Sequence, residues 1–288
     1  MNFFNLPSPI QQLNSEFLRQ YEVELWLKRD DLIHEEISGN KWRKLKYNVA
    51  EAKKQGLHKI VTFGGAYSNH IAATAATGKV LGIDTIGIIR GDEGFENKTL
   101  NAAKENGMRL HFVSRADYKL KTEPAFIREL ENQFGPFYLI AEGGANELGV
   151  QGCEEIINEV EEFFDVIAVS AGTGTTAAGM CRMLKNERLL VFPALKGGGF
   201  ILEEMKQHCT ADQIKKVELQ LNYHFGGYGK SKPEQMEFMY QFNKEFQIEL
   251  DQIYTSKMMF GLFDLIKKNH FKKGTKILAI HTGGLQGN

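Results

Sequence analysis

Short apolar runs alternate along the chain with longer segments in which apolar residues recur at helical spacing. The apolar runs predict strands at residues 23–27, 60–63, 85–90, 110–113, 137–141, 166–169, 189–192, 217–221 and 277–280. The segments between them predict helices at residues 40–56, 71–81, 97–106, 124–132, 147–164, 233–246 and 256–269, with another opened by the loop at residues 171–179. Strands that are apolar on both faces and alternate with helices are typical of parallel sheets covered on both sides. The pattern therefore predicts an α/β fold.

Glycine-rich turns follow several of the predicted strands, at residues 64–65, 143–144, 172–174, 197–199 and 283–284. In open α/β sheets, ligands bind just beyond the carboxyl ends of the strands. These turns are therefore candidates for one shared ligand site. For any single turn, the plainer interpretation is that glycine serves a tight connection between a strand and a helix.

Lys41 follows Ser38, Gly39 and Asn40 at the start of a predicted helix. Asn40 is of a residue type that caps helices, which would place Lys41 beside the unpaired N–H groups of the first turn. The positive end of a helix lowers the pKa of a nearby lysine, and an amine that is easily made neutral suits Schiff-base chemistry. Read alone, the segment is more often an ordinary basic helix start, because further cations follow it.

Residues 170–179, Ser-Ala-Gly-Thr-Gly-Thr-Thr-Ala-Ala-Gly, follow an apolar strand and open a helix. Glycines let backbone N–H groups turn toward a ligand, threonine hydroxyls add donors, and the helix N-terminus adds positive potential. The segment therefore predicts a site for a phosphate monoester. It also fits a loose dinucleotide pattern at Gly172, Gly174 and Ala177, so NAD binding is an alternative. The next strand ends at residues 192–196 without the acid that would hold a ribose, which disfavours that alternative.

Composition narrows the classes of partner. The 288 residues include 35 basic and 36 acidic side chains, a net charge of −1 that implies no nucleic-acid or membrane partner. The three cysteines are scattered, which argues against a disulfide framework or a zinc site and favours a reducing compartment. We see no signal peptide and no apolar run long enough to span a bilayer. We therefore expect a cytoplasmic protein that acts on a small molecule.

Six motifs in order along nearly the whole chain add a resemblance. They are Lys28-Arg29-Asp30-Asp31, Gly39-Asn40-Lys41-x-Arg43-Lys44-Leu45, Gly64-Gly65-x-x-Ser68-Asn69-His70, Thr173-Gly174-Thr175-Thr176-x-x-Gly179, Tyr254-Thr255-x-Lys257 and His281-Thr282-Gly283-Gly284. With them the chain resembles the pyridoxal-phosphate enzymes of the tryptophan-synthase β-like fold, fold type II. Within that fold it resembles the 1-aminocyclopropane-1-carboxylate deaminase and D-cysteine desulfhydrase family.

The resemblance implies a role for each matching residue. Lys41 would hold the aldehyde of pyridoxal 5'-phosphate as a Schiff base, and Asn69 would bond the ring 3-hydroxyl. The phosphate would lie on Gly172, Thr173, Gly174, Thr175 and Thr176, with Lys44 nearby. Ser68 and the backbone N–H groups of Asn69 and His70 would take the substrate carboxylate. Thr255 would meet the pyridine nitrogen, and Tyr228 and Tyr254 would line the substrate side, although packing is the ordinary role of such aromatic residues.

The resemblance also implies an activity and an architecture. We expect two open parallel-sheet α/β domains, a larger one of residues 1–44 and 146–288 and a smaller inserted one of residues 45–145. The expected reaction is β-elimination from a small amino acid, D-cysteine first, because His70 and Thr255 resemble the desulfhydrase members and a neutral hydroxyl at the pyridine nitrogen suits elimination. Deamination of 1-aminocyclopropane-1-carboxylate and a catalytically silent cofactor-binding protein are the alternatives. The family also suggests a homodimer.

Overall fold

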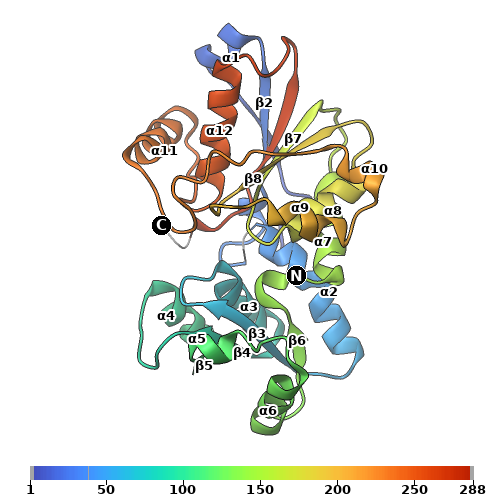
Figure 1. The fold of residues 1–288 in the computed structure, drawn as a ribbon, viewed down its shortest axis with the longest axis vertical. Coiled ribbons are helices and arrows are strands. Elements are labelled where there is room, and N and C mark those ends of the chain that lie inside the picture. The colour runs from blue at the N-terminus through green and yellow to red at the C-terminus, as the bar shows by residue number, and fades with distance from the viewer. Residues whose placement is uncertain (1–2, 38, 286–288) are drawn as a thin grey trace.

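The computed structural model describes residues 3–37 and 39–285, so Ser38 of the lysine motif lies outside the described residues. Its strands form two sheets, which Figure 1 shows in the upper and lower halves of the molecule. The larger sheet has the order β1 (Ile10–Leu13), β2 (Glu24–Lys28), β10 (Lys276–Ile280), β7 (Val166–Ala171), β8 (Arg188–Pro193) and β9 (Val217–Leu219). The smaller sheet has the order β5 (Arg109–Val113), β4 (Asp84–Arg90), β3 (Lys59–Gly65) and β6 (Tyr138–Ile140). All pairs are parallel except β1 with β2.

Helices cover both faces of each sheet. On the larger sheet, one face packs against α1 (Glu16–Tyr21), α11 (Pro233–Phe246) and α12 (Thr255–Lys267), and the other against α7 (Glu147–Asn158), α8 (Thr175–Met183), α9 (Phe200–Lys206) and α10 (Ala211–Ile214). On the smaller sheet, α2 (Asn40–Lys54), α3 (Asn69–Leu81) and α4 (Lys98–Glu105) cover one face, and α5 (Arg115–Tyr118) and α6 (Pro124–Phe134) the other. The expected two-sheet α/β architecture is confirmed.

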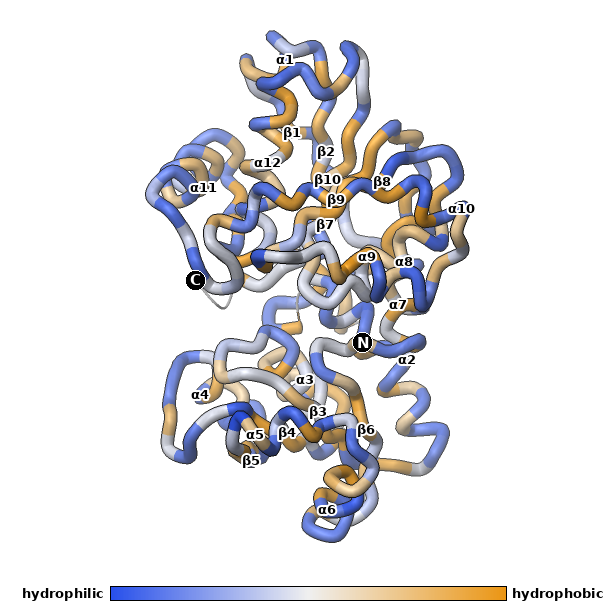
Figure 2. The backbone as a smooth tube through the Cα atoms, viewed as in Figure 1, coloured by the Kyte–Doolittle hydropathy of each residue, from blue (hydrophilic) through white to orange (hydrophobic). Residues whose placement is uncertain are grey.

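Strand β7 shows why the strand segments of the sequence lack alternating polar residues. Val166 and Ala168 pack into the core under α12, whereas Ile167 and Val169 pack into the core under α7 and α8. Both faces are therefore dry, and the strand reads as a continuous apolar run, as parallel strands between helix layers do. In Figure 2 the strands are correspondingly hydrophobic, and most of the hydrophilic backbone lies in outer helices and loops.

Helix α2 and its buried ion cluster join the two sheets. Its apolar residues, such as Leu45 and Val49, pack with the smaller sheet. On its other side Arg43 donates to Asp30 at 2.9 Å and to Glu159 at 2.8 Å. Arg43 and Asp30 are fully buried, so the pair fixes the first turns of α2 against the larger half of the molecule.

The structure corrects several predicted boundaries. The helix predicted at residues 147–164 ends at Asn158, because Phe164 has to turn into the core before β7 begins. β1, α1, α5, α9 and α10 were not predicted, since each is short and has few apolar residues at a regular spacing. A division into domains at 44/45 and 145/146 remains a prediction. Within the described ranges, no helix has both the length and the apolar character needed to cross a bilayer.

Candidate active site

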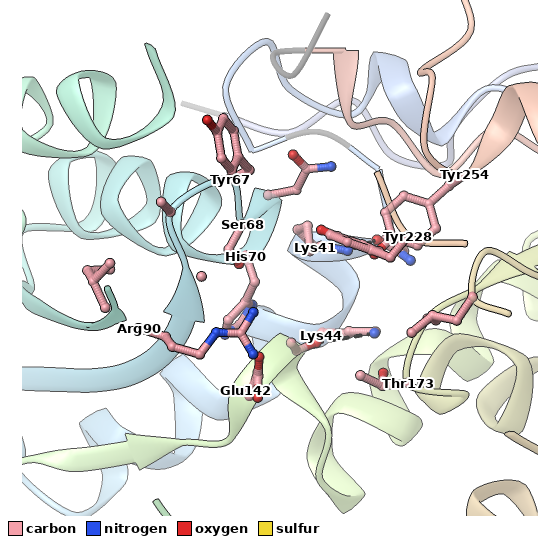
Figure 3. A pocket seen from close by; sticks show the side chains of 18 of the residues that line it. Lys41, Lys44, Tyr67, Ser68, His70, Arg90, Glu142, Thr173, Tyr228 and Tyr254 are labelled. Carbon is pink, nitrogen blue, oxygen red and sulfur yellow. Dashed lines mark hydrogen bonds between the residues drawn. The ribbon is translucent and has the colours of Figure 1, made fainter. Parts of the chain in front are cut away.

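A cavity of about 710 Å³ lies where the carboxyl ends of strands from both sheets meet. The smaller half contributes the ends of β3, β4, β5 and β6, and the larger half the ends of β7, β8 and β10, with the first turn of α2 between them. Four of the five glycine-rich turns contribute to its lining, through Gly65, Gly143, Gly172, Gly174 and Gly283, as expected for a shared site. The turn at residues 197–199 does not line it. Figure 3 shows Lys41, Lys44, Tyr228, Tyr254 and Thr173 around this space, with Ser68 and His70 beside it.

Lys41 is the second residue of α2 and lines the cavity. Its amine donates to Asn40 Oδ1 at 2.7 Å, and Asn40 Nδ2 donates to Thr176 Oγ1 at 2.9 Å. The prediction that Asn40 caps the helix is wrong, because Gly39 occupies that position with φ +65°. A Cβ there would lie 1.8 Å from the carbonyl oxygen of Thr282, so only glycine fits. The amide of Asn40 is thus free to connect Lys41 with the loop before α8.

The pKa of Lys41 is lowered from its ordinary value to about 7. Burial of the ammonium group is the leading cause, and the charge of Lys44 is the second. The sequence predicts this direction from the helix end, whereas in the structure desolvation dominates. At neutral pH a large fraction of Lys41 is therefore an unprotonated amine, the form that attacks a carbonyl.

We expect the rate at which the cofactor-free protein takes up pyridoxal 5'-phosphate to rise with pH around a midpoint near 7. The neutral amine is the reactive form, and its fraction grows as the pH passes the lowered pKa of Lys41. Stopped-flow absorbance between pH 5.5 and 9.5 measures the midpoint. Pyridoxal, which has no phosphate to titrate, should give the same value. A rate that keeps rising to about pH 10, as for an ordinary lysine, would contradict the shift.

The loop between β7 and α8 has the features of a phosphate site. Gly172, Thr173, Gly174 and Thr176 line the cavity, and Gly174 has φ +84° at the N-cap of α8. In this turn the first N–H groups of α8 have no carbonyl partner within the helix. A dianion beside them would meet both these donors and the positive end of the helix.

Lys44 supplies an independent sign that an anion belongs here. Its side chain is 4% exposed, and its one hydrogen bond among the described residues is to the carbonyl oxygen of Gly143 at 3.2 Å. No carboxylate of the described residues lies within 4 Å of it, and burial lowers its pKa. A buried cation without a counter-charge is costly unless a ligand provides one. The residues present therefore fit the phosphate of pyridoxal 5'-phosphate.

We expect Lys44→Met to weaken the affinity for pyridoxal 5'-phosphate by about tenfold to a hundredfold, the loss of a hydrogen bond to a charged group. The cofactor-free variant should be at least as stable as the parent, because it no longer buries an uncompensated charge. Spectroscopic titration and thermal unfolding measure the two effects. Lys46→Met, which removes a cation paired with Glu155 outside the cavity, is the control. Equal losses in both variants would contradict the assignment of Lys44.

The start of α3 places the three residues predicted to bind the substrate. Ser68 is the N-cap, and its Oγ accepts from the N–H of Ile71 at 3.3 Å. Asn69 and His70 follow in the first turn, where backbone N–H groups have no partner within the helix. All three line the cavity. Two N–H groups at a helix N-terminus beside a hydroxyl form a suitable site for a carboxylate.

Tyr228 and Tyr254 lie edge to face across the cavity from the start of α3. The rings of Tyr228 and Tyr254 are 6.1 Å apart at an angle of 69°. Desolvation of the hydroxyl is the leading cause that raises the pKa of each, so both hydroxyls stay protonated at neutral pH. Tyr228 as a whole is 47% exposed. Tyr254 lies over Gly172, where a Cβ would be 3.2 Å from its hydroxyl oxygen. The motif residue Lys257 donates to the carbonyl of Gly227 at 2.8 Å and so holds the loop of Tyr228 in place.

Two predicted residues do not reach the lining. Thr255 is fully buried, and its hydroxyl donates to Asp251 Oδ1 at 2.7 Å. Thr175 is buried beside Thr173, with 3.0 Å between their hydroxyl oxygens. Several polar residues that had no predicted role also line the cavity, among them Arg90, Glu142, Ser170 and Thr282. Arg90 and Glu142 could have been found only by their place at the ends of β4 and β6.

Comparison with known proteins agrees with these features. The family model of the pyridoxal-phosphate dependent enzymes matches residues 2–283. A protein of Pyrococcus horikoshii, provisionally named 1-aminocyclopropane-1-carboxylate deaminase, is 32% identical over 97% of this chain and 90% of its own. A mitochondrial protein of Arabidopsis thaliana, named bifunctional D-cysteine desulfhydrase/1-aminocyclopropane-1-carboxylate deaminase, is 31% identical over 98% of this chain and 77% of its own.

Solved structures agree in the same way. The structure described as an ACC deaminase homologue superposes with a TM-score of 0.83 at 30% identity, covering 99% of this chain and 91% of that one. A threonine deaminase from Solanum lycopersicum, at 15% identity and a TM-score of 0.71, covers 98% of this chain and 80% of that one, and shares the fold alone. The chain belongs to the pyridoxal-phosphate dependent enzymes of fold type II, in the family of 1-aminocyclopropane-1-carboxylate deaminase and D-cysteine desulfhydrase.

Proposed function

We propose that this enzyme eliminates a β-leaving group from a small amino acid, with D-cysteine as the first candidate. D-cysteine and water would give pyruvate, hydrogen sulfide and ammonia. The observation that supports this most is the meeting, in one cavity, of a lysine with a pKa of about 7, an anion-binding loop and a second helix N-terminus. The three suit a cofactor aldehyde, its phosphate and an amino-acid carboxylate, respectively.

Pyridoxal 5'-phosphate, when bound, supplies an electron sink that stabilises negative charge at the α-carbon of an amino acid. The chain would hold its phosphate on residues 172–176 and Lys44, its aldehyde end at Lys41 and its ring 3-hydroxyl at Asn69. Thr255 is predicted at the pyridine nitrogen, but its hydroxyl donates to Asp251 Oδ1. To bond the pyridine nitrogen, the hydroxyl would have to give up that hydrogen bond.

Proton movements can be divided among the side chains by their pKa values. A general base works best when its pKa lies near the working pH, which suits Lys41 at about 7. The raised pKa values of Tyr228 and Tyr254 make these residues hydrogen donors rather than bases. We therefore propose that Lys41 removes the α-proton and that a tyrosine hydroxyl donates to the departing thiolate. Ser68 and the first N–H groups of α3 would hold the carboxylate.

Deamination of 1-aminocyclopropane-1-carboxylate is the second candidate. Both relatives described above carry that activity in their names, and one also carries D-cysteine desulfhydrase. Ring opening with water would release 2-oxobutanoate and ammonia. His70 and Thr255 are the residues that resemble the desulfhydrase members, which is why D-cysteine comes first.

A panel of D-cysteine, L-cysteine and 1-aminocyclopropane-1-carboxylate tests the proposal on the cofactor-loaded enzyme. Sulfide together with pyruvate from D-cysteine is the expected result. 2-Oxobutanoate as the main product would favour the second candidate. A protein that binds the cofactor but releases no oxo acid from the panel would instead be a cofactor-binding protein without this activity.

We further propose that the protein is cytoplasmic and forms a homodimer. Light scattering of the purified protein would test the oligomeric state.

A further inference from the structure

His70 has a buried hydrogen-bond acceptor that the described residues leave unused. The side chain is 2% exposed and lines the cavity, yet Nδ1 has no hydrogen-bond partner among the described residues. Buried polar atoms without a partner are uncommon in folded proteins and call for an explanation. Nothing in the sequence distinguishes this ring from an ordinary structural histidine.

The other ring nitrogen fixes which atom carries the hydrogen. His70 Nε2 lies 3.0 Å from Thr62 Oγ1, and Thr62 Oγ1 donates to the carbonyl oxygen of Ile140 at 2.8 Å. Because a threonine hydroxyl has one hydrogen, its oxygen can only accept from the ring. Nε2 therefore carries the hydrogen, and Nδ1 of the neutral ring presents a lone pair.

The surroundings keep the ring neutral. Burial, followed by the charges of Lys41 and Lys44, lowers the pKa of His70 to about 3. Beside these cations the imidazole stays neutral, so Nδ1 can accept a hydrogen bond without becoming protonated. A Cβ at Gly144 would lie 3.5 Å from Cε1 of the ring, so a glycine borders the ring at the carbon between its two nitrogens. Figure 3 shows His70 between Ser68, Lys41 and Lys44.

We propose that Nδ1 of His70 accepts a hydrogen bond from the α-ammonium group of the bound amino acid. The inference rests on the proposed function, in which an amino acid enters this cavity. Its carboxylate and the phosphate dianion only accept hydrogen bonds, whereas its ammonium group brings three donors. The substrate amine has to arrive beside Lys41, which lines the same cavity as His70 and lies close to it in Figure 3. His70 is then a substrate-positioning side chain, in addition to the role of its backbone N–H.

Two substitutions separate the nitrogens of the ring. The amide of His70→Asn reaches the place of Nδ1 and can offer an oxygen there, whereas the amide of His70→Gln reaches the place of Nε2 and keeps only the contact with Thr62. We expect His70→Gln to raise KM for the amino acid by about tenfold to a hundredfold, and His70→Asn to recover most of that loss. The inhibition constant of 3-mercaptopropionate, the acid of D-cysteine without its amine, should be the same in all three proteins.

The outcomes are distinct. An unchanged KM in His70→Gln, or an equal loss of affinity for the amine-free acid, would overturn the role of Nδ1 while leaving the proposed function intact. Absence of turnover of any amino acid by the parent enzyme would overturn both. Independently of activity, ¹⁵N NMR of the protein should show a protonated Nε2 and an unprotonated Nδ1 at His70, with Nδ1 shifting when an amino acid binds. A proton on Nδ1 before binding would overturn the inference.

Discussion

Replacing Lys41 with alanine is expected to lower amino-acid turnover by about a thousandfold or more, within the range that a positioned base contributes. The substitution removes the amine that would hold the cofactor aldehyde and the group proposed to move the α-proton. It leaves the loop of residues 172–176 and Lys44 in place, so cofactor should still bind, although without a covalent link. Product formation and the absorption spectrum of the cofactor-loaded variant measure the two effects.

Lys46→Ala is the matched control for this substitution. Lys46 lies on the same helix, outside the cavity lining, and pairs with Glu155. We expect it to keep the spectrum and the turnover of the parent enzyme. Turnover by Lys41→Ala within tenfold of the parent would mean that another group acts as the base.

Arg43→Ala is expected to reduce the free energy of unfolding by about 3–5 kcal/mol, the usual cost of breaking a buried ion pair. Asp30 is fully buried, and without the guanidinium its carboxylate has no counter-charge from α2. Glu159 also loses its contacts with Arg43. Urea denaturation of the cofactor-free protein measures the loss. Lys54→Ala, which removes an exposed partner of Glu51, should change the value by less than about 1 kcal/mol.

The contact between Arg43 and Glu159 predicts a pH dependence of stability. Burial alone would raise the pKa of Glu159, but hydrogen bonds from Arg43 and Lys28 outweigh it and lower the value. A carboxylate whose pKa is lower in the folded protein stabilises the fold above its ordinary pKa, and this contribution is lost as the pH falls toward the lowered value. Stability of the parent should therefore decline on the acid side more steeply than that of Arg43→Ala. Parallel declines would contradict the proposed partner.

The fold class could be predicted from the sequence because it depends on apolar patterns within single strands and helices. Strands such as β7 are buried on both faces, and helices such as α12 have one long apolar side, so both leave a clear pattern. Short elements such as β1 and α9 leave too few positions to show one. The helix at 147–164 was predicted too long, because the turn of Phe164 into the core depends on tertiary packing.

The lining of the cavity could be predicted where the matching residues face it directly. Lys41, Ser68, Tyr228 and most of the loop before α8 meet in one cavity, as the resemblance implied. The hydrogen-bond partners of Asn40 and Thr255 were harder to predict. They depend on residues that are distant in sequence or on the geometry of the local turn. Thr176 binds Asn40 across 136 positions, and Asp251 takes the hydroxyl of Thr255. The open acceptor on His70 needed the positions of Thr62 and Ile140, which no sequence pattern gives.

Reduction of the cofactor-loaded enzyme with borohydride, followed by peptide mapping, examines the identity of the bonding amine directly. Three lysines with lowered pKa values compete for that role, namely Lys41, Lys44 and Lys257. We expect the pyridoxyl group on Lys41, in the peptide that begins the long helix after Gly39. A pyridoxyl group on Lys44 or Lys257, or none on the protein, would show that the cavity is used in another way.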